Sequence, residues 1–137
     1  LARAFALNAI GPALIMKHVL PRLPRSGKAV FATLSARVGS IDDNRLGGWY
    51  SYRASKAALN QLVRTAAVEL TRRSPDALCI ALHPGTVATA LSAPFAAAGL
   101  EVHSPAAAAR HLLAVVDQLT ADANGGFFDW CGQPVPW

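Results

Sequence analysis

The stretch YSYRASKAALNQLVRTAAVELTR, residues 50–72, decides how the rest of the chain is interpreted. Good helix formers fill it from about Ser51 to Arg72, and its apolar side chains recur at helical spacing, which predicts one long helix. Tyr52 and Lys56 are four residues apart near its start, so both project from one face. The helix therefore brings a phenol and an ammonium group to one place.

Apolar segments on either side of this helix give a regular alternation of helices and strands. Short β-prone runs predict buried strands at 29–34, 76–82 and 126–129. Helical periodicity predicts two further helices, one over 2–20 with a kink near Pro12 and one over 105–119 with Ser104 as its N-cap. We therefore expect an α/β fold, a parallel sheet flanked by helices.

Composition limits the classes of function. With 137 residues, 53% hydrophobic and 15% charged, the chain has enough apolar material for the core of one domain. The net charge of +5 is scattered without a basic run, so we expect no nucleic-acid partner. No uncharged apolar stretch reaches membrane-spanning length and no signal peptide is evident, so we expect no membrane partner and a cytoplasmic location.

The two cysteines carry no motif. Cys79 and Cys131 are far apart and belong to no CxxC or Cys/His cluster, so we expect neither a disulfide framework nor a metal site. Both are expected to be small buried residues in a reducing compartment.

Tyr52 and Lys56 are candidates for acid/base chemistry. A nearby ammonium group favours the phenolate, so we expect Lys56 to lower the pKa of Tyr52 and help it exchange a proton with an alcohol or carbonyl oxygen. A solvated helical pair is the alternative interpretation. Ser35 follows the strand 29–34 and precedes a glycine-rich loop, so its hydroxyl is expected near Tyr52 in a cleft at the carboxyl end of the sheet. A serine of an ordinary turn is the alternative there.

Four motifs in order strengthen the catalytic interpretation: NAIGP at 8–12, LSARVG at 34–39, YxxxK at 52–56 and HPGTVAT at 83–89. Together they resemble the short-chain dehydrogenase/reductase family, and in particular its C-factor-like and sniffer-like carbonyl reductase branch. The resemblance implies the C-terminal half of a Rossmann-type doubly wound parallel sheet. Residues 1–137 would then be a partial domain whose N-terminal strands and glycine-rich loop are missing.

The resemblance also assigns roles to residues. Tyr52 would be the general acid/base, and Lys56 would bind the nicotinamide ribose and lower the pKa of Tyr52. Asn8 would hold a water that links Lys56 to solvent, whereas without the family pattern it is a plain polar helix residue. The loop residues Pro84, Gly85, Val87 and Thr89 would contact the cofactor, although Pro-Gly also makes a simple turn. His83 is expected to be a strand-end residue and not a catalyst.

Two departures from the family pattern matter. Ala36 stands three residues before Gly39, where the family usually has its serine, so Ser35 is one residue early. No GxxxGxG turn occurs in the 137 residues, although that turn holds the cofactor pyrophosphate in this family. The cofactor is expected to be NADP or NAD, with NADP slightly favoured, and the residues that decide are absent from this chain.

The resulting prediction is an NAD(P)-dependent oxidoreductase that transfers a hydride to or from a small carbonyl or alcohol. The alternative is a non-catalytic signalling or oligomerising protein derived from the same fold. The resemblance implies a homodimer or homotetramer, paired through the helices around 8–20 and 51–70. Segments 42–49 and 91–103 would line the substrate pocket, and their apolar residues favour a modest hydrophobic carbonyl compound: Trp49, Leu91, Pro94, Phe95 and Leu100.

Overall fold

Three parallel strands form the central sheet, in the order β1-β2-β5. They are β1 (Ala29–Leu34), β2 (Ala77–His83) and β5 (Phe127–Asp129). The computed structural model describes residues 1–90, 92 and 101–137. β2 lies between its two neighbours, and six of its seven residues are buried. The predicted parallel sheet, with the strands at the predicted places, is confirmed.

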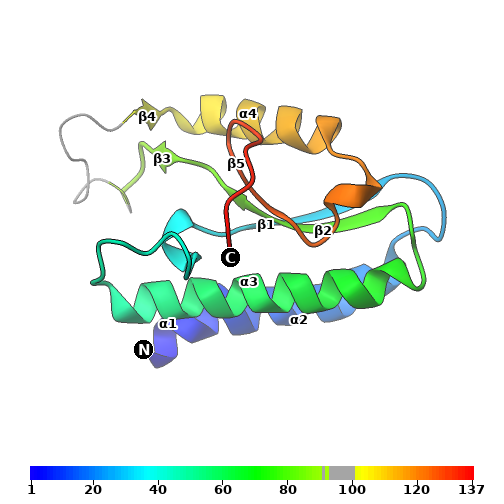
Figure 1. The fold of residues 1–137 in the computed structure, drawn as a ribbon, viewed down its shortest axis with the longest axis horizontal. Helices are drawn as coiled ribbons and strands as arrows, with labels where there is room; N and C mark the ends of the chain where they lie inside the picture. Colours follow the sequence, from blue (N-terminus) through cyan, green and yellow to red (C-terminus); the bar gives the residue numbers. More distant parts are fainter. Residues whose placement is uncertain (91, 93–100) are drawn as a thin grey trace.

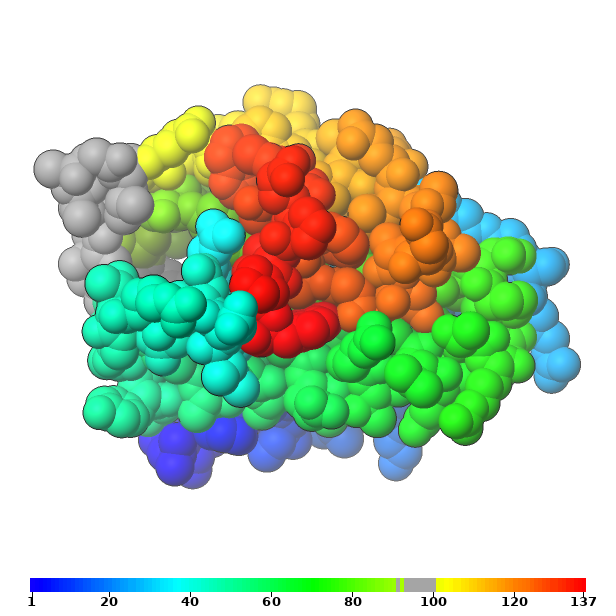
Figure 2. Space-filling view, viewed as in Figure 1, coloured from blue at the N-terminus to red at the C-terminus, as the bar shows by residue number. Residues whose placement is uncertain are grey.

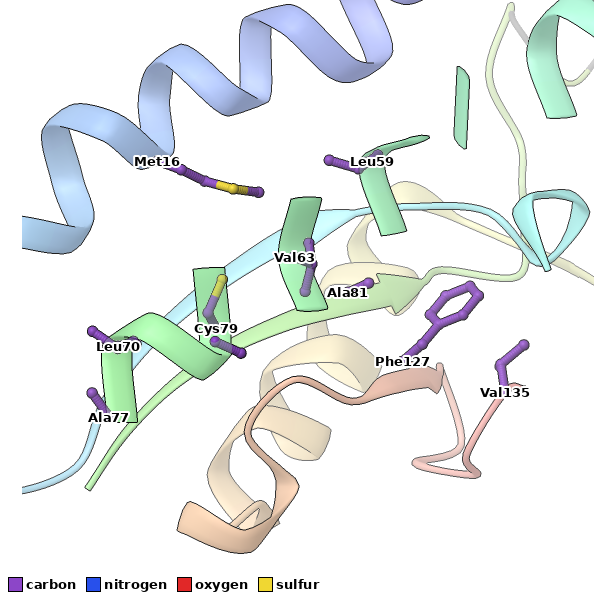
Figure 3. Packing of buried hydrophobic residues seen from close by; sticks show 10 residues of the cluster. Met16, Leu59, Val63, Leu70, Ala77, Cys79, Ala81, Phe127 and Val135 are labelled. Carbon is purple, nitrogen blue, oxygen red and sulfur yellow. The ribbon is translucent and has the colours of Figure 1, made fainter. Parts of the chain in front are cut away.

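Helices cover both faces of this sheet (Figure 1). α3 (Tyr50–Thr71) and the N-terminal helices lie on one face, and α4 (Pro105–Gln118) lies on the other. The alternation of side chains along β2 explains the two layers. Cys79 and Ala81 pack with Leu59 and Val63 of α3 (Figure 3), whereas Leu78, Ile80 and Leu82 pack with Val115 of α4. Each face of the strand is therefore apolar, as a doubly covered parallel sheet requires.

The N-terminal helical run departs from the prediction in one detail. It consists of α1 (Ala2–Phe5), a π-helical turn η1 (Ala6–Ile10), α2 (Gly11–Val19) and a 3-10 turn η2 (Leu20–Arg22). The irregularity thus lies in η1, which ends two residues before Pro12, close to the predicted kink. Proline has no N–H for the carbonyl of Asn8, four residues earlier, so the disturbance falls on the preceding turn.

The same helical run is apolar on its outer side. By length and composition alone, Ala2–Arg22 could cross a membrane. Its inner side, however, packs on the protein: Ala9 and Met16 are buried, and Met16 belongs to the core beneath α3 (Figure 3). Helices that border a protein core meet the same criterion of length and composition, so the property identifies no membrane partner.

Two short strands were missed by the sequence patterns. β3 (Thr86–Val87) and β4 (Val102–His103) form a separate parallel pair. Two residues are too few to show a period, and the pair forms only because segments far apart in sequence meet. Beyond it, the amide of Ala88 donates to the carbonyl of His103 at 2.9 Å. The strands therefore join the segment after Pro84 to the start of α4.

The C-terminal tail closes over the edge of the sheet. The amide of Val135 donates to Phe127, and the carbonyl of Trp137 accepts from Asp42, which ties the tail to the loop before α3. Figure 2 shows the tail lying against this loop and against α3. Cys79 is buried as predicted, but Cys131 is exposed, so the prediction of its burial is wrong. The turn around Gly132 places that thiol outside the core.

Candidate active site

Lys56 is held at the carboxyl end of the sheet by several contacts. It lies in the second turn of α3 and is only 9% exposed. Its Nζ donates to the carbonyl of Leu34 at 2.9 Å, at the end of β1. Gly39 packs on the same side chain so closely that a Cβ there would lie 2.7 Å from Cβ of Lys56. Burial lowers the pKa of Lys56 below its ordinary value.

Tyr52 lies beside Lys56, as the helical spacing predicts. The Nζ of Lys56 is 5.9 Å from the centroid of the Tyr52 ring. The pKa of Tyr52 is raised, because burial disfavours the phenolate. The expectation that Lys56 lowers the pKa of Tyr52 is therefore wrong for this chain by itself. The ammonium group is directed to the Leu34 carbonyl, and burial of the phenol is the cause of the raised pKa of Tyr52.

Asn8 reaches the same helix from the N-terminal run. Its Nδ2 donates to Oγ of Ser55 at 3.0 Å, and Ser55 in turn donates to the carbonyl of Tyr52 at 2.8 Å. The π-helical turn η1 contains Asn8, and such turns are frequent at functional sites. Asn8 is thus joined to the Tyr52 turn of α3, while its role toward a water stays a prediction. Ser55 was not predicted, since a serine inside a helix gives no distinctive pattern.

Ser35 is not presented to Tyr52. The residue is 4% exposed, and its hydroxyl donates to Oδ1 of Asn60 at 2.6 Å. Asn60 lies two helical turns beyond Tyr52 on α3. The prediction that Ser35 shares a hydrogen bond with Tyr52 and substrate is therefore not supported, because side-chain alternation along β1 turns this residue toward the helix. Asn60 could have been found by its spacing of four residues from Lys56.

The loop between η3 (Arg37–Gly39) and α3 is held by Arg53, another residue that the sequence did not indicate. Its guanidinium donates to the carbonyls of Val38, Gly47 and Gly48 at 3.1–3.2 Å. Its Cζ also lies 5.9 Å from the ring of Trp49, which is 53% exposed. Arg53 thereby fixes the predicted substrate loop at 42–49. The other predicted pocket residues, Leu91, Pro94, Phe95 and Leu100, lie outside the described residues.

The predicted cofactor loop begins at the sharp turn of Pro84 and Gly85. Gly85 has φ of +74°, and a Cβ there would lie 2.8 Å from Cδ1 of Trp130 and 3.1 Å from Cδ2 of His103. This glycine is therefore required for packing within the chain, whatever else its backbone approaches. Trp130 was missed because it comes from the C-terminal turn and meets the loop only in the fold.

The remaining residues of this loop follow β3. The carbonyl of Val87 accepts a hydrogen bond from Oγ of Ser92. The amide of Thr89 donates to Oγ of Ser92 at 3.2 Å. Thr89 itself is exposed. Their contacts with a cofactor stay predictions.

His83 ends β2 as predicted. Its pKa is lowered, mainly because burial disfavours the imidazolium and further because of Arg37, while Asp129 partly opposes this. Its Nδ1 is buried and has no hydrogen-bond partner within residues 1–90, 92 and 101–137. Among the described residues, this nitrogen is therefore hydrogen-bonded to no nucleophile.

Known proteins match this chain along most of its length. A family model described as enoyl-(acyl carrier protein) reductase matches residues 1–118. C-signal of Myxococcus xanthus is 38% identical over 138 residues, which are 100% of this chain and 78% of that protein.

Solved structures agree with this match. Carbonyl reductase Sniffer of D. melanogaster has a TM-score of 0.82 and 28% identity, over 97% of this chain and 55% of that one. A carbonyl reductase from Pseudomonas aeruginosa PAO1 in complex with NADP has a TM-score of 0.69 and 31% identity, over 99% of this chain and 54% of that one. This chain thus spans about half the length of these reductases. By sequence and by fold, it belongs to the short-chain dehydrogenase/reductase family, a family of oxidoreductases, and resembles C-signal and the sniffer-like carbonyl reductases within it.

Proposed function

We propose that this chain provides the catalytic half of an NAD(P)-dependent reductase that interconverts a small carbonyl compound and its alcohol. The observation that carries the proposal is the placement of Tyr52 beside a buried Lys56, which Leu34 holds at the end of β1. A buried ammonium group next to a phenol, at the carboxyl end of a parallel sheet, is an arrangement suited to proton transfer.

Tyr52 supplies the proton. Because burial raises its pKa, the phenol stays protonated at neutral pH and can donate to a carbonyl oxygen that gains negative charge. The reverse reaction needs the phenolate, which a bound cation beside the ring would favour. The chain by itself is therefore better prepared for reduction than for oxidation.

Lys56 has donors left for a ligand. An ammonium group has three N–H bonds, and the Leu34 carbonyl takes one of them. The two others can bind the ribose hydroxyls of a nicotinamide cofactor, which would supply the hydride. Asn8 supports this turn of α3 through Ser55.

The residues present fit one end of such a cofactor. Lys56 and the backbone of Pro84, Gly85 and Val87, with the exposed Thr89, suit the nicotinamide end, where an ammonium group and a glycine turn lie at the end of the sheet. No GxxxGxG turn for the pyrophosphate occurs in these 137 residues. NADP is favoured over NAD by the relative that binds NADP.

Cofactor titration tests the proposal directly. NADPH and NADH are titrated into this chain and into a version extended upstream in the same reading frame by about a hundred residues, the remaining share of a typical domain. We expect binding and carbonyl reduction in the extended version, with turnover lost in Tyr52→Phe. Tyr50→Phe is the matched control, because Tyr50 is 87% exposed and should keep turnover. Full activity of Tyr52→Phe would refute the proposal.

A second candidate is a signalling or oligomerising protein, favoured by the likeness to C-signal over 78% of that protein. The outer side of the N-terminal run exposes large apolar residues, among them Ile10, Leu14 and Ile15 at 54–55%. A second copy would cover this surface, giving a homodimer or homotetramer.

Sedimentation tests that assembly. Leu14→Gln should shift the chain toward monomer, whereas Leu113→Gln should not, because Leu113, which is 65% exposed, lies on α4 at the opposite face of the sheet. A wild-type chain that binds neither cofactor, even when extended, and still self-associates would favour this second candidate.

A further inference from the structure

We propose that Ser35 and Asn60 are positioning residues for Lys56. Their buried hydrogen bond fixes the end of β1 against α3, so that the Leu34 carbonyl holds the Lys56 ammonium group in place. The inference rests on the proposed function in one respect, that Lys56 is a working residue of the site. It assigns Ser35 a role different from substrate contact, and it adds Asn60 as a second residue that positions Lys56.

The peptide unit between Leu34 and Ser35 is the first step. This unit is planar, so its C=O and N–H point in opposite directions. The N–H of Ser35 donates to the carbonyl of Leu82 at 2.8 Å. The C=O of Leu34 is consequently turned away from β2, and it accepts from Nζ of Lys56 at 2.9 Å. Whatever fixes this peptide unit fixes the acceptor of Lys56.

Asn60 anchors the same unit from the helix. It lies one turn beyond Lys56, on the same face of α3, and is 4% exposed. Its Oδ1 accepts from the Ser35 hydroxyl at 2.6 Å, while its Nδ2 is buried without a partner among the described residues. The hydrogen bonding of the Asn60 side chain therefore depends on Ser35. Loss of either group leaves the other unpaired in the core, so the two should act as a unit.

Burial separates this role from catalysis by contact. Ser35 and Asn60 are each only 4% exposed, and the short bond between them occupies the Ser35 hydroxyl proton. A serine that contacts substrate must direct its hydroxyl into an accessible cleft. The residue after it is Ala36 and has no hydroxyl. Ser35 thus acts through the backbone and Lys56.

The test follows Lys56 itself in the full chain. Its titration is measured from the Cε–Hε signals of the lysines by heteronuclear NMR in wild type, Ser35→Ala, Asn60→Ala and the double variant. We expect the Lys56 midpoint to fall by about one pH unit in each single variant, because the ammonium group loses its fixed acceptor, and no further in the double variant.

Matched variants control for simple destabilisation. Ser74→Ala removes another buried serine hydroxyl, 1% exposed and away from the site, and should leave the Lys56 midpoint unchanged. Ser35→Thr keeps a hydroxyl and should have the wild-type Lys56 midpoint. If Ser35→Ala fails to fold, the Lys56 midpoints of Ser35→Thr and Asn60→Ala are compared instead. An unchanged or higher Lys56 midpoint in folded Ser35→Ala and Asn60→Ala would overturn the inference.

Turnover of the upstream-extended version provides a second, independent measurement. We expect Ser35→Ala and Asn60→Ala each to lower kcat about tenfold and to raise KM for the cofactor but not for the carbonyl substrate, with no further loss in the double variant. If the losses multiply, or only KM for the substrate changes, Ser35 contacts substrate and the inference is wrong. Failure of the proposed function would instead appear as full turnover of Tyr52→Phe, while the Lys56 titration still reports on the pair.

Discussion

At the scale of single residues, Gly85 shows how one missing side chain shapes the end of the sheet. Its φ of +74° and the closeness of Trp130 both oppose a Cβ. Gly85→Ala should therefore lower the free energy of unfolding by about 2–4 kcal/mol, from backbone strain and overpacking together. Urea unfolding measures the change. Gly27→Ala is the control: Gly27 has φ of +81° but no atom within 4 Å of a built Cβ, so only the strain, about 1 kcal/mol, applies. Equal losses would contradict this account.

His83 gives a residue-scale prediction of pH dependence. In the folded chain its pKa lies below the ordinary 6.5. At a pH between the folded pKa and 6.5, the unfolded chain therefore binds more protons than the folded chain. The free energy of unfolding should therefore fall as pH drops through this window, with a slope of at most about 1.4 kcal/mol per pH unit from this one group. His83→Gln should flatten that slope, measured by urea unfolding across a pH series. An identical slope in both proteins would show that burial of His83 does not couple to folding.

Residue roles were predictable from sequence only where the partners are local. Tyr52 and Lys56 are one helical turn apart, so their meeting follows from the helix period. Ser35 and Asn60 are 25 residues apart and meet only because β1 packs under α3. The sequence indicated a reactive serine because a strand-end hydroxyl has the same pattern whether it faces a cleft or a helix.

At the scale of elements, α4 begins where local signals place it. The hydroxyl of Ser104 accepts from the amide of Ala107 at 3.2 Å, as an N-cap does. Ser104→Ala should lower the free energy of unfolding by about 1 kcal/mol, because that amide loses its partner. Ser104→Asp keeps an acceptor and should stay within a few tenths of wild type by urea unfolding. A similar loss in both variants would point to packing and not to the cap.

Elements that depend on distant contacts were less predictable. The π-helical turn η1 was not foreseen, and β3 and β4 were missed because each consists of two residues. Their pairing Thr86↔Val102 joins positions 16 residues apart in sequence, and Trp130 packs behind it from the C-terminal turn. No local pattern reports such a meeting.

At the scale of the whole molecule, the two thiols report on the integrity of the sheet. Cys79 lies in the central strand β2, and burial raises its pKa to about 12, whereas Cys131 is exposed. The pKa of Cys131 is raised as well, by desolvation and by Asp129, so the contrast between the two thiols rests on exposure. A thiol reagent at neutral pH should label Cys131 faster than Cys79, which reacts only when the sheet opens. Cys131→Ser should leave one slow thiol, which becomes fast in urea. Rapid labelling of Cys79 without denaturant would mean that β2 is not the stable centre described here.

By itself, the sequence determined the alternation of helices and strands, the parallel sheet, the N-cap of α4 and the meeting of Tyr52 with Lys56. These features follow from short-range periodicity, secondary-structure propensity and turn chemistry, which depend only on residues close together in sequence. Only the tertiary structure decided that Ser35 faces Asn60, that the Leu34 carbonyl holds Lys56 and that Gly85 packs on Trp130. Burial also decided the direction of the Tyr52 pKa. Each of these depends on which segments exclude water from one another, a property of the packed molecule that no local stretch of sequence contains.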